Sequence, residues 1–166
     1  MKWSKKMNKK EPYKYISEHG VHYEVTEHKP VFNMEELDFI ELPYPEWDAK
    51  NLFVRDDKKK NYYLITAKGN KRVNLRKFRK QCNLRSLSFA SPEELMALMS
   101  LTPGTVTPLG LLNDRNCKVC FYLDIEFKGN IIGVHPNDNT ATVWMKTEDL
   151  IQLIREHGNE VKFVEL

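Results

Sequence analysis

One segment constrains what this chain can fold into more than any other: LTPGTVTPLG at residues 101–110. It holds two prolines, two glycines and three threonines. Proline fixes φ and lacks an amide donor, whereas glycine permits backbone shapes that other residues resist. The segment therefore cannot be a regular helix, and a central strand is unfavourable. We predict a stiff, shaped loop whose carbonyls and hydroxyls face a partner, with a plain connector as the alternative.

The length of 166 residues suits one domain with its own hydrophobic core. A composition of 41% hydrophobic and 30% charged residues is typical of a globular protein. No apolar run approaches the roughly 20 residues that span a bilayer, and no apolar segment of a secretory signal follows the lysine-rich N-terminus. We expect a cytoplasmic protein without membrane association, with a basic flexible tail over 1–12 and one domain over 13–166.

The charge distribution is uneven although the net charge is only +3. Residues 24–48 hold eight acids and one lysine, whereas residues 50–80 hold twelve bases and two acids, a local balance of 12 − 2 = +10. A solvated surface is one explanation, and contact with a phosphate backbone is the other. We favour a polyanion partner, because Lys58, Lys59 and Lys60 fall in a tight turn and further bases follow it.

Three cysteines are too few for a disulfide framework and indicate a reducing compartment. The pair Cys117 and Cys120 has the spacing of a redox or metal pair, but residues 117–127 alternate as a strand. Residues three apart in a strand point to opposite faces. We therefore expect these thiols to be structural, and we expect no metal site and no cofactor.

The hydrophobic pattern predicts helices alternating with hairpins, and therefore a mixed α+β fold with a mixed sheet. The clearest local signal is Ser91, followed by proline and two glutamates, which is typical of a helix start. Predicted helices cover 13–18, 34–39, 74–80, the stretch after Ser91, and 147–157. Predicted strands cover 22–26, 51–56, 62–67, 118–127, 131–134, 140–145 and 161–164.

The sequence lacks the common catalytic signatures: the nucleophile elbow, the zinc-protease helix, the Walker loop and the dinucleotide fingerprint. What remains are polar residues at element ends, Lys50 and Asn51 before an apolar run and the turn at 135–140. Each alone also fits a solvated strand start or an ordinary turn.

Four segments occur in an order that resembles a known family. They are KNLFVRD at 50–56, LSFASPEEL at 87–95, PGTVTP at 103–108 with LLND at 111–114, and HPNDNTAT at 135–142. Together they resemble the YbaK/prolyl-tRNA-synthetase-associated editing domain, most closely its free-standing ProX-type (PrdX-like) branch. The resemblance extends from about residue 15 to the C-terminus. It implies one domain with a mixed, mostly antiparallel, barrel-like sheet flanked by helices.

The resemblance also implies an activity and a set of site residues. Members of this branch act in trans as aminoacyl-tRNA deacylases, and alanine mischarged onto proline tRNA is the most fitting substrate. By motif match the catalytic residues are Lys50, Asn51, Gly104 and His135. The implied substrate-binding residues are Thr105, Val106, Thr107, Pro108, Asn137 and Asn139.

The implied partner is tRNA, docked through phosphates by Lys58, Lys59, Lys60, Lys71 and Arg72, with a transient association with prolyl-tRNA synthetase. A synthetase pocket shaped for proline rejects alanine weakly, because each missing methylene is worth only about 1–3 kcal/mol. A smaller pocket, for which Val106, Leu109 and residues 121–125 are candidate walls, would admit alanine and exclude proline. Two alternatives stay open: another misacylated tRNA such as cysteinyl-tRNA, or a module that binds tRNA or the synthetase without hydrolysis.

Overall fold

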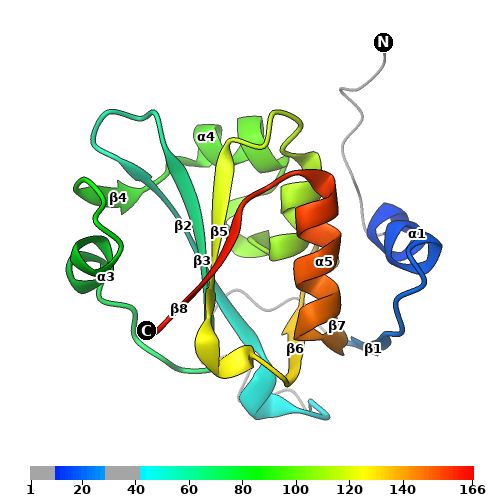
Figure 1. Cartoon of the computed structure of the whole chain (residues 1–166). Helices are drawn as coiled ribbons and strands as arrows, with labels where there is room; N and C mark the ends of the chain where they lie inside the picture. Colours follow the sequence, from blue (N-terminus) through cyan, green and yellow to red (C-terminus); the bar gives the residue numbers. More distant parts are fainter. Residues whose placement is uncertain (1–9, 29–41) are drawn as a thin grey trace.

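The computed structural model describes residues 10–28 and 42–166, and Figure 1 shows two β-sheets flanked by helices. Within these ranges the α-helices are α1 (Lys10–Glu18), α3 (Leu75–Gln81), α4 (Pro92–Met99) and α5 (Thr147–His157). The strands are β1 (Glu24–Glu27), β2 (Ala49–Asp56), β3 (Tyr62–Lys68), β4 (Leu87–Phe89), β5 (Val119–Asp124), β6 (Ile131–Val134), β7 (Ala141–Lys146) and β8 (Val161–Val164). Four 3-10 turns complete the described part: η1 (Pro45–Trp47), η2 (Pro103–Thr105), η3 (Pro108–Asn113) and η4 (Ile125–Phe127).

The strands divide into a three-stranded sheet, β1-β7-β6, and a five-stranded sheet, β4-β2-β3-β5-β8. Pairing is antiparallel for β1–β7, β6–β7, β2–β3 and β2–β4, and parallel for β3–β5 and β5–β8. The two sheets meet at a parallel bridge between Asp48 and Gly133. The predicted class, one mixed α+β domain with mostly antiparallel pairing, is confirmed.

Strand β2 separates two hydrophobic clusters, because alternate side chains of a strand leave opposite faces. Phe53 belongs to the larger cluster, which also contains buried residues of α4 and α5. Val54 belongs to the smaller cluster, where Phe78 of α3 packs edge-on against Tyr122 with ring centroids 5.0 Å apart. The five-stranded sheet is thus covered by α4 and α5 on one face and by α3 on the other.

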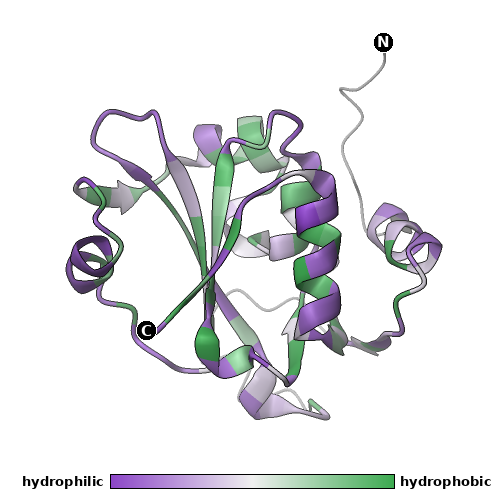
Figure 2. Cartoon of the chain, in the orientation of Figure 1, coloured by the Kyte–Doolittle hydropathy of each residue, from purple (hydrophilic) through white to green (hydrophobic). Residues whose placement is uncertain are grey.

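The helix ends follow the local chemistry of the sequence. The side chain of Asn74 caps α3 by accepting from the amide of Lys77, and Ser91 and Glu94 form a reciprocal capping box at α4. Helix α5 ends at Gly158, whose φ of 121° suits glycine. Figure 2 shows α5 with hydrophobic and hydrophilic bands in alternation, as expected of a helix half buried on a sheet.

The predicted strand over 118–127 is too long, since β5 covers only Val119–Asp124. Asp124 caps η4 by accepting from the amide of Glu126, and this local bond replaces the strand ladder. At the other end, Cys117 lies outside the strand with φ of 51°. The argument that strand alternation separates the two thiols is therefore wrong, although all three cysteines are free in the structure.

Other boundaries differ by small amounts. Helix α1 begins at Lys10, three residues before the predicted start, because Glu11 and its neighbours continue the same helical turn. The hydrophobic pattern does not predict the three-residue strand β4, which pairs with the end of β2. The predicted helix over 34–39 lies outside the described residues.

The segment 101–110 forms two short 3-10 turns, η2 and η3, rather than a regular helix or a strand. Thr105 folds back on Thr102, because its hydroxyl donates to the Thr102 carbonyl at 3.0 Å. Gly110 lies so close to the side chain of Leu101 that an added Cβ would collide with it. The segment is therefore a shaped loop, as predicted, although the Thr105 hydroxyl bonds within the loop and does not face a partner.

Candidate active site

Asn51 is the residue that connects β2 to the 101–110 loop. Its side-chain amide donates to the carbonyl of Val106 at 3.3 Å. The hydroxyl of Thr66, on the adjacent strand β3, donates to the Asn51 side-chain oxygen at 2.6 Å. This second bond fixes the direction of the amide, so that its nitrogen faces the loop.

The same loop is tied to the turn at 135–140 by Thr107. The Thr107 hydroxyl is fully buried and donates to the carbonyl of His135 at 2.6 Å. Asn51, Val106, Thr107 and His135, which are distant in sequence, thus lie in one connected network. This network joins the five-stranded sheet, the loop and the three-stranded sheet.

The surroundings of His135 favour its neutral imidazole form. Burial lowers the pKa of His135, and the neighbouring His28 adds to that effect. Its Nδ1 lies 3.2 Å from the carbonyl of Ala141, so Nδ1 carries the proton and Nε2 is left as an acceptor. A neutral acceptor nitrogen of this kind can orient a water molecule or a hydroxyl group.

His28 is a residue of this region that sequence reasoning missed. Its ring lies edge-on to His135 with centroids 6.5 Å apart, and its Nε2 lies 3.0 Å from the hydroxyl of Thr142. The antiparallel pairing of β1 with β7 brings these residues together. No local motif marks His28, because the contact depends on that pairing.

Lys50 and Asn51 are adjacent in β2 and therefore leave the strand on opposite faces. Asn51 lies on the same face of β2 as Phe53. Lys50 lies on the opposite face with Leu52 and Val54, which pack in the cluster beneath α3. The Lys50 ammonium donates to the carbonyl of Lys71 at 3.3 Å. The structure thus places Lys50 next to the connection between β3 and α3, on the other side of β2 from the amide of Asn51.

Lys71 is already paired within the protein. Its ammonium lies 2.8 Å from the carboxylate of Asp124, which is fully buried, and it also forms an ion pair with Glu126. Asp124 additionally accepts from the backbone amide of Lys68 at 3.0 Å. This cluster holds the end of β3 against the end of β5. As a phosphate contact, Lys71 is the least available of the five predicted bases.

The lysine turn lies at the far end of the β2–β3 hairpin from Lys50. Lys50 is paired with Ala67 near the open end, whereas Lys58, Lys59 and Lys60 lie in the exposed turn that closes it. A strand rises about 3.3 Å per residue, so six residues of β2 separate the two ends by about 20 Å. The predicted tRNA contacts therefore do not form one patch with Lys50.

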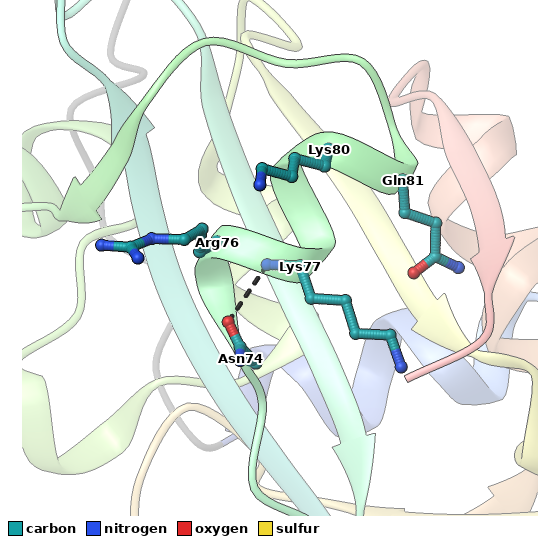
Figure 3. Close-up of a pocket in the computed structure, with 5 residues that line it drawn as sticks. All are labelled: Asn74, Arg76, Lys77, Lys80 and Gln81. Atoms are coloured by element: carbon teal, nitrogen blue, oxygen red, sulfur yellow. Dashed lines mark hydrogen bonds between the residues drawn. The ribbon is translucent and has the colours of Figure 1, made fainter.

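A second group of bases lies on α3, on the face of the sheet to which Lys50 belongs. Figure 3 shows Arg76 and Lys80 pointing to one side of this helix, and Lys77 and Gln81 to the other. With Asn74 these four residues line a hollow of about 610 Å³.

The remaining predicted site residues lie in the loop and the turn. Gly104 and Thr105 are half-buried in η2, whereas Pro108 is buried at the start of η3. Asn137 has a left-handed φ of 64°, and Asn139 is buried at 8% exposure. Direct contact of these five residues with substrate stays a prediction.

The candidate pocket walls need a correction. Leu109, Phe121 and Leu123 have no exposed surface and belong to the large core cluster. A side chain without exposed surface contacts the protein itself and cannot line an open pocket. Val106 keeps partial exposure and stays a candidate.

In residues 10–28 and 42–166, no group of three or more histidine, cysteine or acidic side chains is arranged to hold a metal ion. None of the helices in the same ranges is long and apolar enough to cross a membrane.

Comparison with known proteins identifies the family. The model of the aminoacyl-tRNA editing domain matches residues 28–153. The chain is 36% identical over 156 residues to the prolyl-tRNA editing protein ProX of Acetoanaerobium sticklandii, covering 91% of this chain and 93% of the relative. It is 32% identical over 150 residues to the mouse prolyl-tRNA synthetase associated domain-containing protein 1, covering 85% of this chain and 86% of the relative.

A solved structure described as a candidate trans-editing enzyme for prolyl tRNA synthetase superposes with a TM-score of 0.68 at 20% identity, over 95% of this chain and 96% of that one. This likeness supports the fold. The family model and the 36% identical relative together identify an editing domain. The chain belongs to the aminoacyl-tRNA editing domain family, and it is a deacylase whose substrate is a misacylated tRNA.

Proposed function

We propose that this protein hydrolyses alanine from proline tRNA, acting in trans on the tRNA after the synthetase has released it. The proposal is supported by the network that joins Asn51, the 101–110 loop and His135. It is also supported by the 36% identity to a protein named for prolyl-tRNA editing.

The chemistry asks little of the protein, because an aminoacyl ester is already an activated acyl group. Hydrolysis needs a positioned water and stabilisation of the charge that develops on the carbonyl oxygen. In our proposal the second amide hydrogen of Asn51 serves that oxygen, since the first is bonded to Val106. The loss of one such donor typically costs about 10²–10³ in kcat.

Water is positioned, in our proposal, by the acceptor nitrogen of His135 and by carbonyls of the 101–110 loop, with help from the ribose hydroxyl of the tRNA. The attacking water passes its proton, through that hydroxyl, to the ribose oxygen that leaves with the tRNA, so no side chain has to act as a strong base. Gly104 and Thr105 would lie along the substrate, where η2 leaves them half-buried.

Lys50 has two candidate roles: stabilising the oxygen charge or holding the terminal phosphate of the tRNA. Its register on the α3 side of β2, away from Asn51, favours the phosphate role. We propose that Lys50 anchors the 3′ end of the tRNA, so that the ester passes β2 and reaches Asn51.

Selectivity follows from size in this proposal. A pocket that admits alanine and excludes proline removes the error that a synthetase pocket shaped for proline cannot prevent by binding alone. Val106 is the candidate wall, because it is partly exposed and its carbonyl is fixed by Asn51.

The substrate is tested by incubating the protein with proline tRNA charged separately with alanine, cysteine or proline, and following loss of the ester. We expect alanine to be released fastest and proline to be retained. Preferential release of cysteine would shift the assignment to cysteinyl-tRNA. Binding of all three without turnover would favour a module that holds tRNA or a synthetase.

Replacement of Lys50 tests the anchor. We expect Lys50→Ala to lower kcat/KM for deacylation by about 10- to 100-fold, because a hydrogen bond to a charged group is worth about 1.5–3 kcal/mol. The melting temperature should stay close to that of the wild type. Lys118→Ala removes an exposed lysine at the start of β5 and serves as the matched control. An unchanged rate in Lys50→Ala would mean that this lysine is misassigned.

We also propose a transient association with prolyl-tRNA synthetase, which would bring the deacylase to freshly charged tRNA. Sedimentation of the two proteins with and without proline tRNA tests it. Independent sedimentation in both conditions would contradict the association and leave the deacylase activity unaffected.

A further inference from the structure

The exposed bases of α3 form a surface that the established activity does not explain. We call Arg76, Lys77 and Lys80 the α3 surface. They line the hollow of about 610 Å³ shown in Figure 3, together with Asn74 and Gln81. All three are exposed, and Phe78 is the one residue of this helix that is buried.

The charges of the α3 surface are uncompensated. Within the residues that the structure describes, no ion pair involves Arg76, Lys77 or Lys80. By contrast, Arg55 and Arg85 each face a carboxylate. In the described ranges the Lys58–Lys60 turn also takes part in no ion pair, so the position of α3, and not the lack of pairing, distinguishes the two groups.

The spacing of these cations works against the helix. Arg76 and Lys80 are four residues apart and Lys77 and Lys80 are three apart, so like charges lie next to each other on the helix surface. The sequence of α3, LRKFRKQ, contains no acid that would relieve this repulsion. Figure 2 shows the helix as predominantly hydrophilic. A polyanion bound across the helix would remove the repulsion.

The location of α3 connects it to the site. The helix packs on one face of the five-stranded sheet, and Lys50 lies on that same face because it alternates with Leu52 and Val54. The connection between β3 and α3 carries Lys71, whose carbonyl accepts from Lys50, and the exposed Arg72. Figure 1 shows α3 part-way between the 57–61 turn and the start of β2. A phosphate backbone crossing α3 would thus lead past Arg72 to Lys50.

We infer that the α3 surface is the docking site for the phosphate backbone of the tRNA acceptor stem, and that the Lys58–Lys60 turn is not. The inference rests on the proposed function and adds the path by which the substrate reaches it. Lysine and arginine bind backbone phosphates without reading the sequence, so this surface contributes affinity rather than identity.

The test compares two triple variants that remove the same charge from different places. The α3 variant is Arg76→Gln, Lys77→Gln and Lys80→Gln, and the matched control is Lys58→Gln, Lys59→Gln and Lys60→Gln. Deacylation of alanyl-tRNA(Pro) and tRNA binding at several salt concentrations are measured for both, alongside the wild type.

For the α3 variant we expect KM for alanyl-tRNA(Pro) to rise at least tenfold with kcat nearly unchanged. The slope of log affinity against log salt should become shallower by about 3, since each lost phosphate contact contributes about 0.9. Hydrolysis of a short aminoacylated CCA fragment, which lacks the stem, should stay at the wild-type rate. The control should behave as the wild type.

The inference would be overturned if the lysine-turn variant lost tRNA affinity while the α3 variant bound tRNA like the wild type. Equal rate losses on the full tRNA and on the CCA fragment would also overturn it, since that result indicates damage to the site. The melting temperature of the α3 variant should equal or exceed that of the wild type, because repulsion within the helix is relieved. If the wild type hydrolyses none of the charged tRNAs, the proposed function fails. The salt dependence of tRNA binding then decides by itself whether the α3 surface is the docking site.

Discussion

At the scale of single residues, the site depends on the orientation of one amide. The side chain of Asn51 presents its nitrogen to Val106 because its oxygen accepts from Thr66 at 2.6 Å. Thr66 is fully buried and touches the substrate in no part of our proposal. It is therefore a positioning residue, and its effect should be seen in the rate of the chemical step.

We predict that Thr66→Val, which keeps the shape but removes the donor, lowers kcat at least tenfold and leaves KM within twofold. The physical reason is that the Asn51 amide loses the bond that fixes its direction. Thr66→Ser restores the donor and should recover most of the rate. Equal activity of Val and Ser variants, measured by steady-state deacylation, would show that Thr66 serves only the fold.

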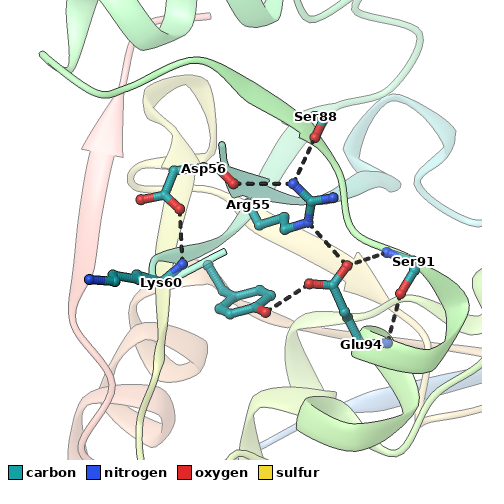
Figure 4. Close-up of polar contacts among 7 residues, drawn as sticks. Arg55, Asp56, Lys60, Ser88, Ser91 and Glu94 are labelled. Carbon is teal, nitrogen blue, oxygen red and sulfur yellow. Dashed lines mark hydrogen bonds and ion pairs between the residues drawn. The ribbon is translucent and has the colours of Figure 1, made fainter. Parts of the chain in front are cut away.

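At the scale of elements, α4 determines where the 101–110 loop begins. Figure 4 shows how Glu94 ties this helix to the sheet: it accepts from Arg55 at 3.1 Å and from Tyr62 at 2.7 Å. It also closes the capping box with Ser91. Burial alone would raise the pKa of Glu94, but these hydrogen bonds outweigh it and lower that pKa to about 2.

A carboxylate with a lowered pKa stabilises the fold above its unfolded pKa, and that contribution is lost as pH falls from about 4.5 to about 2. We predict that Glu94→Gln lowers the free energy of unfolding at pH 7 by about 1–3 kcal/mol. The difference from the wild type should shrink on acidification to pH 3. Urea unfolding at both pH values measures it. Glu93→Gln, in the same helical turn but exposed, is the control and should change little.

At the scale of the whole molecule, the two sheets meet at Asp48 and Gly133. Gly133 lies against the ring of Trp144, where an added Cβ would collide with it. Asp48 is 3% exposed, and burial raises the pKa of its carboxyl to about 7, with the amide of Ala49 partly opposing the rise. The junction between the sheets therefore contains an acid that resists ionisation.

Because the folded protein holds the Asp48 proton more tightly than the unfolded chain does, the free energy of unfolding is highest below pH 4. It falls as the pH rises from about 4 to about 7. We predict that Asp48→Asn removes this loss, which amounts to about 4 kcal/mol by pH 8. The variant should gain most over the wild type at pH 8 and little at pH 4, as measured by chemical denaturation. For Glu46→Gln, an exposed neighbour, the free energy of unfolding plotted against pH should run parallel to the wild-type curve. A curve for Asp48→Asn that also runs parallel to the wild type would contradict the prediction.

Local signals in the sequence predicted the parts that depend on neighbouring residues. The caps at Asn74 and Ser91, the end of α5 at Gly158 and the β2–β3 hairpin each depend on chemistry within a few positions. Motif order also indicated the family, because four segments that match together are far more specific than any one of them. The basic stretch over 50–80 was visible as composition.

The tertiary structure decided which of those residues meet. Period-two alternation separates Lys50 from Asn51, but only packing shows that one side of β2 faces the loop and the other faces α3. His28 meets His135 only through strand pairing, and the bases divide between a distant turn and α3. Local hydrogen bonds and dihedral preferences act over a few residues and can be read from the chain. The faces of a sheet and the approach of its partners come from long-range burial, which no short stretch of sequence specifies.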